Sequence, residues 1–186
     1  MHHPAADLGP ELDHDVAAST RLMRTFAFLD LCGFTDFVDT HGDDEAVEEL
    51  GLLRSTVRDV ARRCGVRVDK WLGDGVMLVG VDTVPLIDAV MHIEARTTGQ
   101  ARLPLRAGIA AGPVIMLEGD DYVGRSVNLA ARLCDRARPG QVLAAADLAE
   151  TLPDGVSARP SAGLRLKGFT RRVEVVSLKR AAPMGA

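Results

Sequence analysis

Four side chains of this sequence have types and spacings that suit chemistry at a phosphoryl group. Asp30 and Asp74 each follow an apolar run and stand beside turn-forming glycines, as expected for carboxylates at strand ends. Asn128, the only asparagine of the chain, comes one helical turn before Arg132, so the amide and the guanidinium share a helix face. Two carboxylates suit a divalent cation, and a guanidinium suits charge that develops at phosphorus. Together the four residues predict a metal-assisted reaction at a phosphate.

The two aspartates need strands to position them. The apolar run at 24–31 predicts a buried strand that delivers Asp30 to its carboxyl end, where open sheets bind ligands. Strands at 66–72 and 76–81, joined by a Gly-Asp-Gly turn, predict a hairpin with Asp74 at its tip. Taken singly, Asp30 is as well explained as a helix cap and Asp74 as an ordinary turn residue. Only their combination with the amide and the guanidinium favours a site.

The rest of the pattern predicts one sheet covered by helices. A short helix at 33–40 precedes a longer one that Asp43 or Asp44 caps and that ends near Gly65. An amphipathic helix is expected at 83–98, and another at 123–136 carries the amide and the guanidinium. Further strands are expected at 105–117, with an interruption at Gly112-Pro113, and around 142, 164–166 and 173–178. This order indicates an α+β fold.

Length and composition favour one domain in a reducing compartment. A chain of 186 residues with a net charge of -4 has no broad basic face, which argues against nucleic acid as a partner. Its three cysteines match neither paired disulfides nor a zinc spacing, and no apolar run suits a membrane span or a signal peptide. We therefore expect a cytoplasmic protein with no membrane partner. Residues 1–20 are expected to be a disordered leader, 21–180 the domain and 181–186 a tail.

Three blocks of sequence surround the candidate residues, and their order along the chain is informative. They are Phe28-Leu-Asp-Leu-Cys-Gly-Phe-Thr35, Lys70-Trp-Leu-Gly-Asp-Gly75 and Tyr122-Val-Gly-Arg-Ser-Val-Asn-Leu-Ala-Ala-Arg-Leu133. In this order they resemble the catalytic domain of class III adenylate and guanylate cyclases, and the similarity spans about 21–179. The resemblance implies that family's ferredoxin-like α+β fold, with a central, mostly antiparallel sheet and helices packed on it. It also implies a head-to-tail homodimer whose subunits share each active site.

The resemblance assigns roles to the residues that match its motifs. Asp30 and Asp74 of one subunit, with the Leu31 carbonyl, would hold two Mg²⁺ or Mn²⁺ ions. Asn128 and Arg132 of the other subunit would orient the substrate and stabilise the transition state. The plain alternative for the arginine is a surface side chain paired along its helix.

Lys70 and Asp121 occupy positions that resemble the family's purine-reading residues. Adenine presents an acceptor at N1 and a donor at N6, whereas guanine presents a donor and an acceptor there. A lysine donor with an aspartate acceptor therefore fits adenine, and ATP is the expected substrate. Lys70 also remains explicable as a hairpin lysine on a solvated face.

The phosphates have two further candidate partners. Gly33, Phe34 and Thr35 form a strand-to-helix turn whose backbone N–H groups could cradle a triphosphate. Lys167 resembles the family's late-strand lysine that contacts the distal phosphates, although a solvated strand edge explains it almost as well. Arg125 is assigned no role. The expected activity is adenylate cyclase, and a non-catalytic cyclase-homology domain and a guanylate cyclase remain as alternatives.

Overall fold

The computed structural model describes residues 21–117 and 121–181. The predicted leader at 1–20 lies outside the described residues, as does all but the first residue of the predicted tail. Within the described residues, no helix has both the length and the apolar character that crossing a membrane requires.

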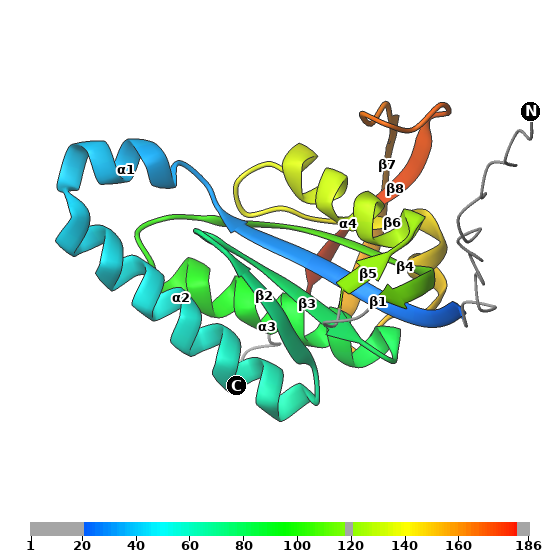
Figure 1. Cartoon of the computed structure of the whole chain (residues 1–186), viewed down its shortest axis with the longest axis horizontal. Helices are drawn as coiled ribbons and strands as arrows, with labels where there is room; N and C mark the ends of the chain where they lie inside the picture. The colour runs from blue at the N-terminus through cyan, green and yellow to red at the C-terminus, as the bar shows by residue number, and fades with distance from the viewer. Residues whose placement is uncertain (1–20, 118–120, 182–186) are drawn as a thin grey trace, which may run out of the picture.

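Within these described ranges an eight-stranded sheet forms the framework, and its order is β2-β3-β1-β4-β6-β8-β7, with β5 paired to β4 (Figure 1). Neighbouring strands are antiparallel except β4 and β6, which are parallel. The sheet is thus mostly antiparallel, as expected. The strands are β1 (Arg21–Leu31), β2 (Arg67–Leu72), β3 (Gly75–Gly80), β4 (Leu105–Leu117), β5 (Asp121–Val123), β6 (Val142–Ala145), β7 (Val156–Leu164) and β8 (Val173–Arg180).

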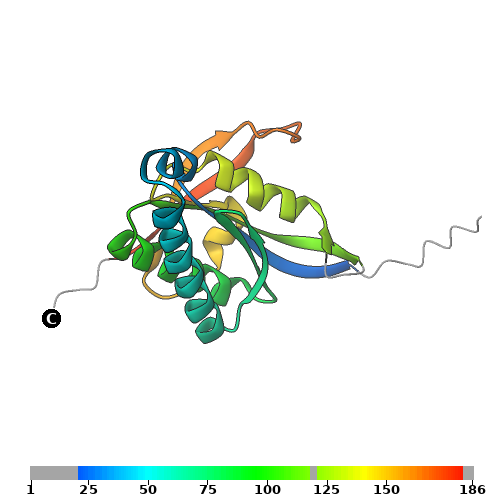
Figure 2. The ribbon, with the colours of Figure 1, turned by 60° about the vertical axis from the view of Figure 1, so that its left-hand side comes forward.

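Helices cover both faces of this sheet (Figures 1 and 2). The helices are α1 (Phe34–His41), α2 (Asp43–Cys64), α3 (Thr83–Gln100), α4 (Arg125–Arg136) and the 3₁₀ helix η1 (Ala146–Glu150). One core lies between the sheet and α2 and α3, and includes Val57 and Val90, both fully buried. A second core lies under α4 and includes Leu133. The sheet and the helices packed on it confirm the α+β class that the element order predicted.

Helix α2 begins and ends at glycines. It was expected to be capped by Asp43 or Asp44, but Gly42 is the N-cap and both aspartates lie in the first turn without a side-chain capping bond. Their charge still favours the helix because it lies near the positive end of the helix dipole. The expected end at Gly65 is confirmed, since Gly65 adopts the left-handed conformation at φ 66°.

Two strand predictions need correction. The expected interruption at Gly112-Pro113 is wrong, because β4 runs unbroken through both residues. Its partner β6 pairs only with Ala107 to Ile109, so Pro113 lies where β6 no longer flanks the strand and a missing N–H is tolerated. β7 was predicted only around 164–166, yet it covers Val156–Leu164. Pro160 concealed it, and proline is acceptable here because β7 is an edge strand.

Candidate active site

Asp30 and Asp74 lie close together where β1 meets the β2–β3 turn. Asp30 is paired in register with Gly75, and the Leu31 N–H lies 3.4 Å from the Asp74 carbonyl. A Cβ at Gly75 would come within 2.9 Å of the Leu29 carbonyl and 3.3 Å of the Asp30 carboxylate. A side chain at this position would clash with the neighbouring strand, which explains why the segment has a glycine at residue 75.

Like charge and burial act on this pair of carboxylates. The pKa of Asp74 is raised, mainly because burial disfavours the ionised carboxylate and then because Asp30 is near. Among the described residues, no three His, Cys, Asp or Glu side chains gather as a metal cluster. Two carboxylates nevertheless fit Mg²⁺, which usually takes one or two carboxylates and completes its shell with phosphate oxygens and water.

Arg106 is a residue of this region that the sequence reasoning missed. It stands opposite Asp30 in the β1–β4 register, and its Nε and Nη2 donate to one Asp30 oxygen at 2.9 and 2.6 Å. Its Nη1 lies 3.3 Å from the Asp135 carbonyl at the end of α4. An arginine within an otherwise apolar strand was the available signal, but only the register reveals its partner.

The turn after β1 presents uncapped backbone groups beside these carboxylates. Gly33 adopts the left-handed conformation at φ 78°, and α1 begins at Phe34 without a side-chain capping bond. Phe34 packs against the core, whereas Thr35 is exposed. The first-turn N–H groups of a helix attract anions, so this turn has the character of a phosphate cradle.

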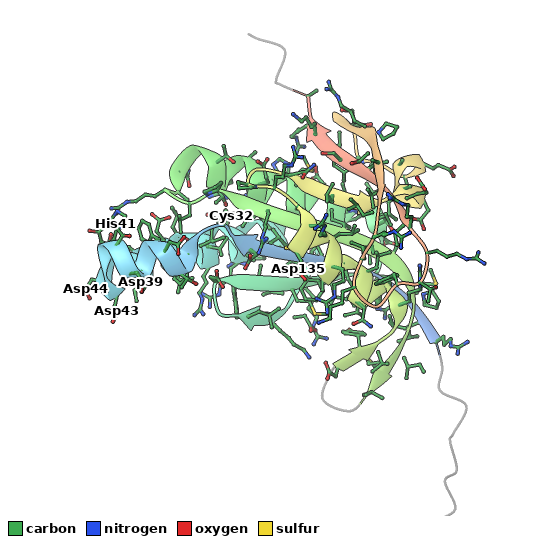
Figure 3. All side chains as sticks on the ribbon, turned by 90° about the horizontal axis from the view of Figure 1, so that it is seen from above. Cys32, Asp39, His41, Asp43, Asp44 and Asp135 are labelled. Atoms are coloured by element: carbon green, nitrogen blue, oxygen red, sulfur yellow. The ribbon has the colours of Figure 1, made fainter. Side chains whose placement is uncertain are left out.

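The acidic end of α1 and the start of α2 project from one end of the sheet (Figure 3).

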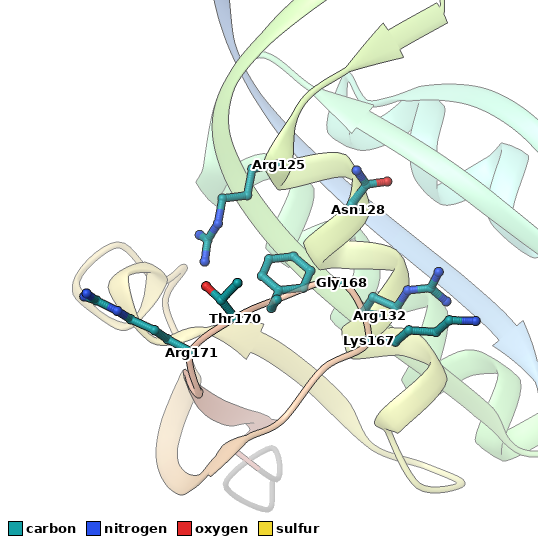
Figure 4. A pocket seen from close by; sticks show the side chains of 8 residues that line it. Arg125, Asn128, Arg132, Lys167, Gly168, Thr170 and Arg171 are labelled. Carbon is teal, nitrogen blue, oxygen red and sulfur yellow. The ribbon is translucent and has the colours of Figure 1, made fainter.

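A second group of candidates lines a cavity of about 520 Å³ between α4 and the loop at 165–172 that joins β7 to β8. Asn128, Arg132 and Lys167 all line it and point to the same side (Figure 4). Arg125 and Arg171 also line it, and no carboxylate does. The cavity is therefore strongly cationic and suits a phosphate chain.

Helix α4 is held against the sheet by a glycine contact. A Cβ at Gly108 would lie 2.2 Å from the Cys134 nitrogen and 2.3 Å from the Ala130 carbonyl, so α4 rests directly on the backbone of β4. Arg132 donates to Asp135 at 2.9 Å, which is the pairing along its own helix that was its plain alternative. Both side chains are about half exposed, at 44% and 57%, so this ion pair adds little stability and is easily exchanged for a phosphate.

Lys70 and Asp121 meet although they are distant in sequence. The Lys70 ammonium donates to the Asp121 carboxylate, which raises the pKa of Lys70 and lowers the pKa of Asp121. An irregularity in the β2–β3 register lies between Val68 and Lys70. The fold thus presents one donor and one acceptor side by side at the edge of the sheet.

Apart from Lys70 and Asp121, the predicted residues fall into two groups in this chain, which we call half-sites. Asp30, Asp74 and the turn at 33–35 make one, and none of them lines the cationic cavity that holds Arg132. Arg106 connects the carboxylate group to the end of α4, because it contacts both Asp30 and the Asp135 carbonyl. The cationic cavity therefore does not enclose the two carboxylates.

Known proteins resemble the chain in both sequence and fold. No family model matches it. An uncharacterised protein of Mycobacterium tuberculosis is 41% identical over 155 residues, which cover 81% of this chain and 40% of that protein. A pH-sensitive adenylate cyclase of Mycobacterium tuberculosis is 36% identical over 167 residues, covering 85% and 41%. The adenylyl cyclase CyaB from P. aeruginosa superposes with a TM-score of 0.78 at 24% identity, covering 90% of this chain and 98% of that one.

The chain belongs to the class III nucleotide cyclase domains. This cyclase domain spans less than half the length of the two M. tuberculosis relatives. Its fold is also shared by the guanylyl cyclase Cya2, with a TM-score of 0.71 at 23% identity, covering 89% of this chain and 96% of that one. Proteins named as adenylyl and as guanylyl cyclases thus share this fold, so the fold alone does not indicate a base.

Proposed function

We propose that this cyclase domain is an adenylate cyclase that converts ATP to 3′,5′-cyclic AMP and pyrophosphate in a head-to-tail homodimer. The observation that carries the proposal is the division of the candidate residues into two half-sites. A two-fold dimer with both surfaces at its interface would bring each half-site of one subunit against the other half-site of its partner. Each composite site would then contain carboxylates from one protomer and the cationic cavity from its partner. We further propose a cytoplasmic location, where ATP is available.

The choice of ATP rests on Lys70 and Asp121. Their contact supplies a donor beside an acceptor, which is the complement of adenine N1 and N6. Guanine would set its N1 donor against the lysine and its O6 acceptor against the aspartate, so neither hydrogen bond could form. The ion pair between the two side chains would open to admit the base.

The phosphate chemistry is divided between the half-sites. Asp30 and Asp74, with the Leu31 carbonyl, would hold two Mg²⁺ or Mn²⁺ ions, which when bound would activate the ribose 3′-hydroxyl and neutralise the phosphates. Arg106 balances the charge of Asp30 in the free subunit. The N–H groups of Gly33, Phe34 and Thr35 would bind phosphate oxygens.

The cationic cavity would stabilise the reacting phosphorus. Arg132 would leave Asp135 and place its planar guanidinium against the α-phosphate, where negative charge increases as the 3′-oxygen attacks. Asn128, one turn earlier on the same exposed face of α4, would orient that oxygen. Lys167 would hold the distal phosphates that leave as pyrophosphate.

Mixing of inactive subunits tests the shared site. Purified protein with ATP and Mn²⁺ should form cyclic AMP, while Asp30→Ala and Arg132→Ala should each be inactive. If subunits exchange freely at equal amounts, half the dimers carry one intact site of two, so activity should return to roughly a quarter of the unmutated value. In a mixture of unmutated protein with a double variant that carries both changes, each heterodimer has no intact site, so activity should fall from about half to about a quarter of the unmutated value as subunits exchange. Absence of rescue in the first mixture, with subunit exchange verified, would contradict the composite site.

One observation supports a second candidate, a non-catalytic cyclase-homology domain. Asp30 and Arg132 are both engaged in ion pairs within the chain, and each pair occupies a group that the cyclase proposal requires to be free. Nucleotide binding without cyclic AMP formation in the unmutated protein, with either metal ion, would favour this candidate.

A further inference from the structure

Arg125 is a strongly basic residue to which the three sequence blocks assign no role. It is the first residue of α4, it is exposed, and among the described residues it has no ion pair. Its guanidinium carbon lies 4.9 Å from the ring centroid of Phe169, which is within the range of a cation–π contact. Figure 4 shows this side chain directed toward the loop at 165–172, whereas Asn128 and Arg132 point to the other side.

Phe169 anchors the loop that carries Lys167. Its ring is partly buried against the core beneath α4, and its N–H donates to the Leu166 carbonyl at 3.1 Å, closing a turn. Gly168, at φ 87°, allows that turn, and Leu166 is buried with 5% of its surface exposed. The exposed Lys167 therefore lies between two anchored residues, Leu166 and Phe169, and Arg125 contacts the second of them.

We propose that Arg125 and Phe169 are positioning residues, whose stack fastens the 165–172 loop to the first turn of α4 and thereby sets Lys167 on the same side of the cavity as Asn128. The inference rests on the proposed function, because it is the phosphate chain of the nucleotide that needs these two groups on one side. The stack links the two walls of the cationic cavity, one from α4 and one from the loop. Arg125 acts through the loop and does not itself touch phosphate.

Hydrogen exchange of the loop amides tests the fastening without any assay of activity. A partly exposed cation–π contact shifts a local opening equilibrium by about two- to fivefold. Arg125→Ala and Phe169→Leu should each speed exchange of the 165–172 amides by that factor, and Arg125→Lys should restore most of the protection. Arg171→Ala is the matched control, because it removes a charge from the same cavity and Arg171 is directed away from Arg125 (Figure 4). Unchanged exchange in Arg125→Ala would overturn the proposal.

Pyrophosphate binding, measured by calorimetry, separates positioning from direct contact. Arg125→Ala should weaken pyrophosphate about two- to fivefold when Lys167 is present and should have little effect in a Lys167→Ala background. An equal loss in both backgrounds would mean that Arg125 binds phosphate itself and would overturn the positioning role. If Lys167→Ala leaves pyrophosphate affinity unchanged, the failure belongs to the proposed function, and the exchange data still decide whether the stack fastens the loop.

Discussion

The contact between α4 and β4 gives the sharpest test of how the fold positions the cationic cavity. Gly108→Ala would place a methyl carbon 2.2 Å from the Cys134 nitrogen and 2.3 Å from the Ala130 carbonyl. Both are backbone atoms, so no side-chain rotation relieves the overlap and α4 must move away from the sheet. Overpacking of this kind costs about 1–3 kcal/mol, and backbone contacts favour the upper end. At roughly 2–4 °C per kcal/mol for a domain of this size, the Tm should fall by about 6–12 °C.

Gly51→Ala is the matched control for this change. Gly51 lies in the middle of α2, is exposed, and has no atom within 4 Å of a Cβ built on it. Alanine should stabilise that helix by about 0.5–1 kcal/mol and raise the Tm by roughly 1–4 °C. Thermal unfolding followed by circular dichroism measures both variants.

Activity provides a second measurement on the same pair of variants. A displacement of about 1 Å in Asn128 and Arg132 should lower kcat by as much as roughly 10²-fold in Gly108→Ala, at a temperature where it remains folded. Gly51→Ala should keep the unmutated rate. Equal Tm values for Gly108→Ala and the unmutated protein would refute the inferred packing of α4 on β4.

Two further predictions concern the base and the carboxylates. Lys70→Glu combined with Asp121→Cys should reduce ATP turnover by at least about tenfold, because two charge-assisted hydrogen bonds to adenine are lost, and undiminished turnover would refute their role as base readers. Asp30→Asn should lower the raised pKa of Asp74 part of the way toward 3.8, because the like charge is removed while burial remains. Carbon-13 NMR of the carboxyl groups measures that shift. An unchanged Asp74 pKa in Asp30→Asn would show that the two carboxylates are not coupled. Because metal binding needs the ionised carboxylate, the unmutated protein should bind metal above the raised pKa of Asp74 and lose that affinity as the pH falls through it.

Much of the fold could be predicted from the sequence, because several helices and turns are determined by residues close together in the chain. The helical spacing at 43–64, its terminal Gly65 and the Gly-Asp-Gly hairpin each have a local physical cause, so the elements appear where they were predicted. Errors arose where tertiary context overrides local preference. Gly112-Pro113 was predicted to interrupt a strand, yet Pro113 sits where β4 lacks a partner on one side, and Pro160 likewise lies in an edge strand where no N–H is needed.

The identity of the chemical groups came from the sequence itself. Asp30, Asp74, Asn128 and Arg132 were found by residue type and spacing, because a helix face and a strand end are local properties. The contact of Asp30 with Arg106 was not found in this way. Arg106 meets Asp30 only through the β1–β4 register, and the stack of Arg125 joins segments that no local pattern connects. Contacts between distant segments depend on how strands align and how closely a helix approaches them, and those distances exist only once the chain has packed.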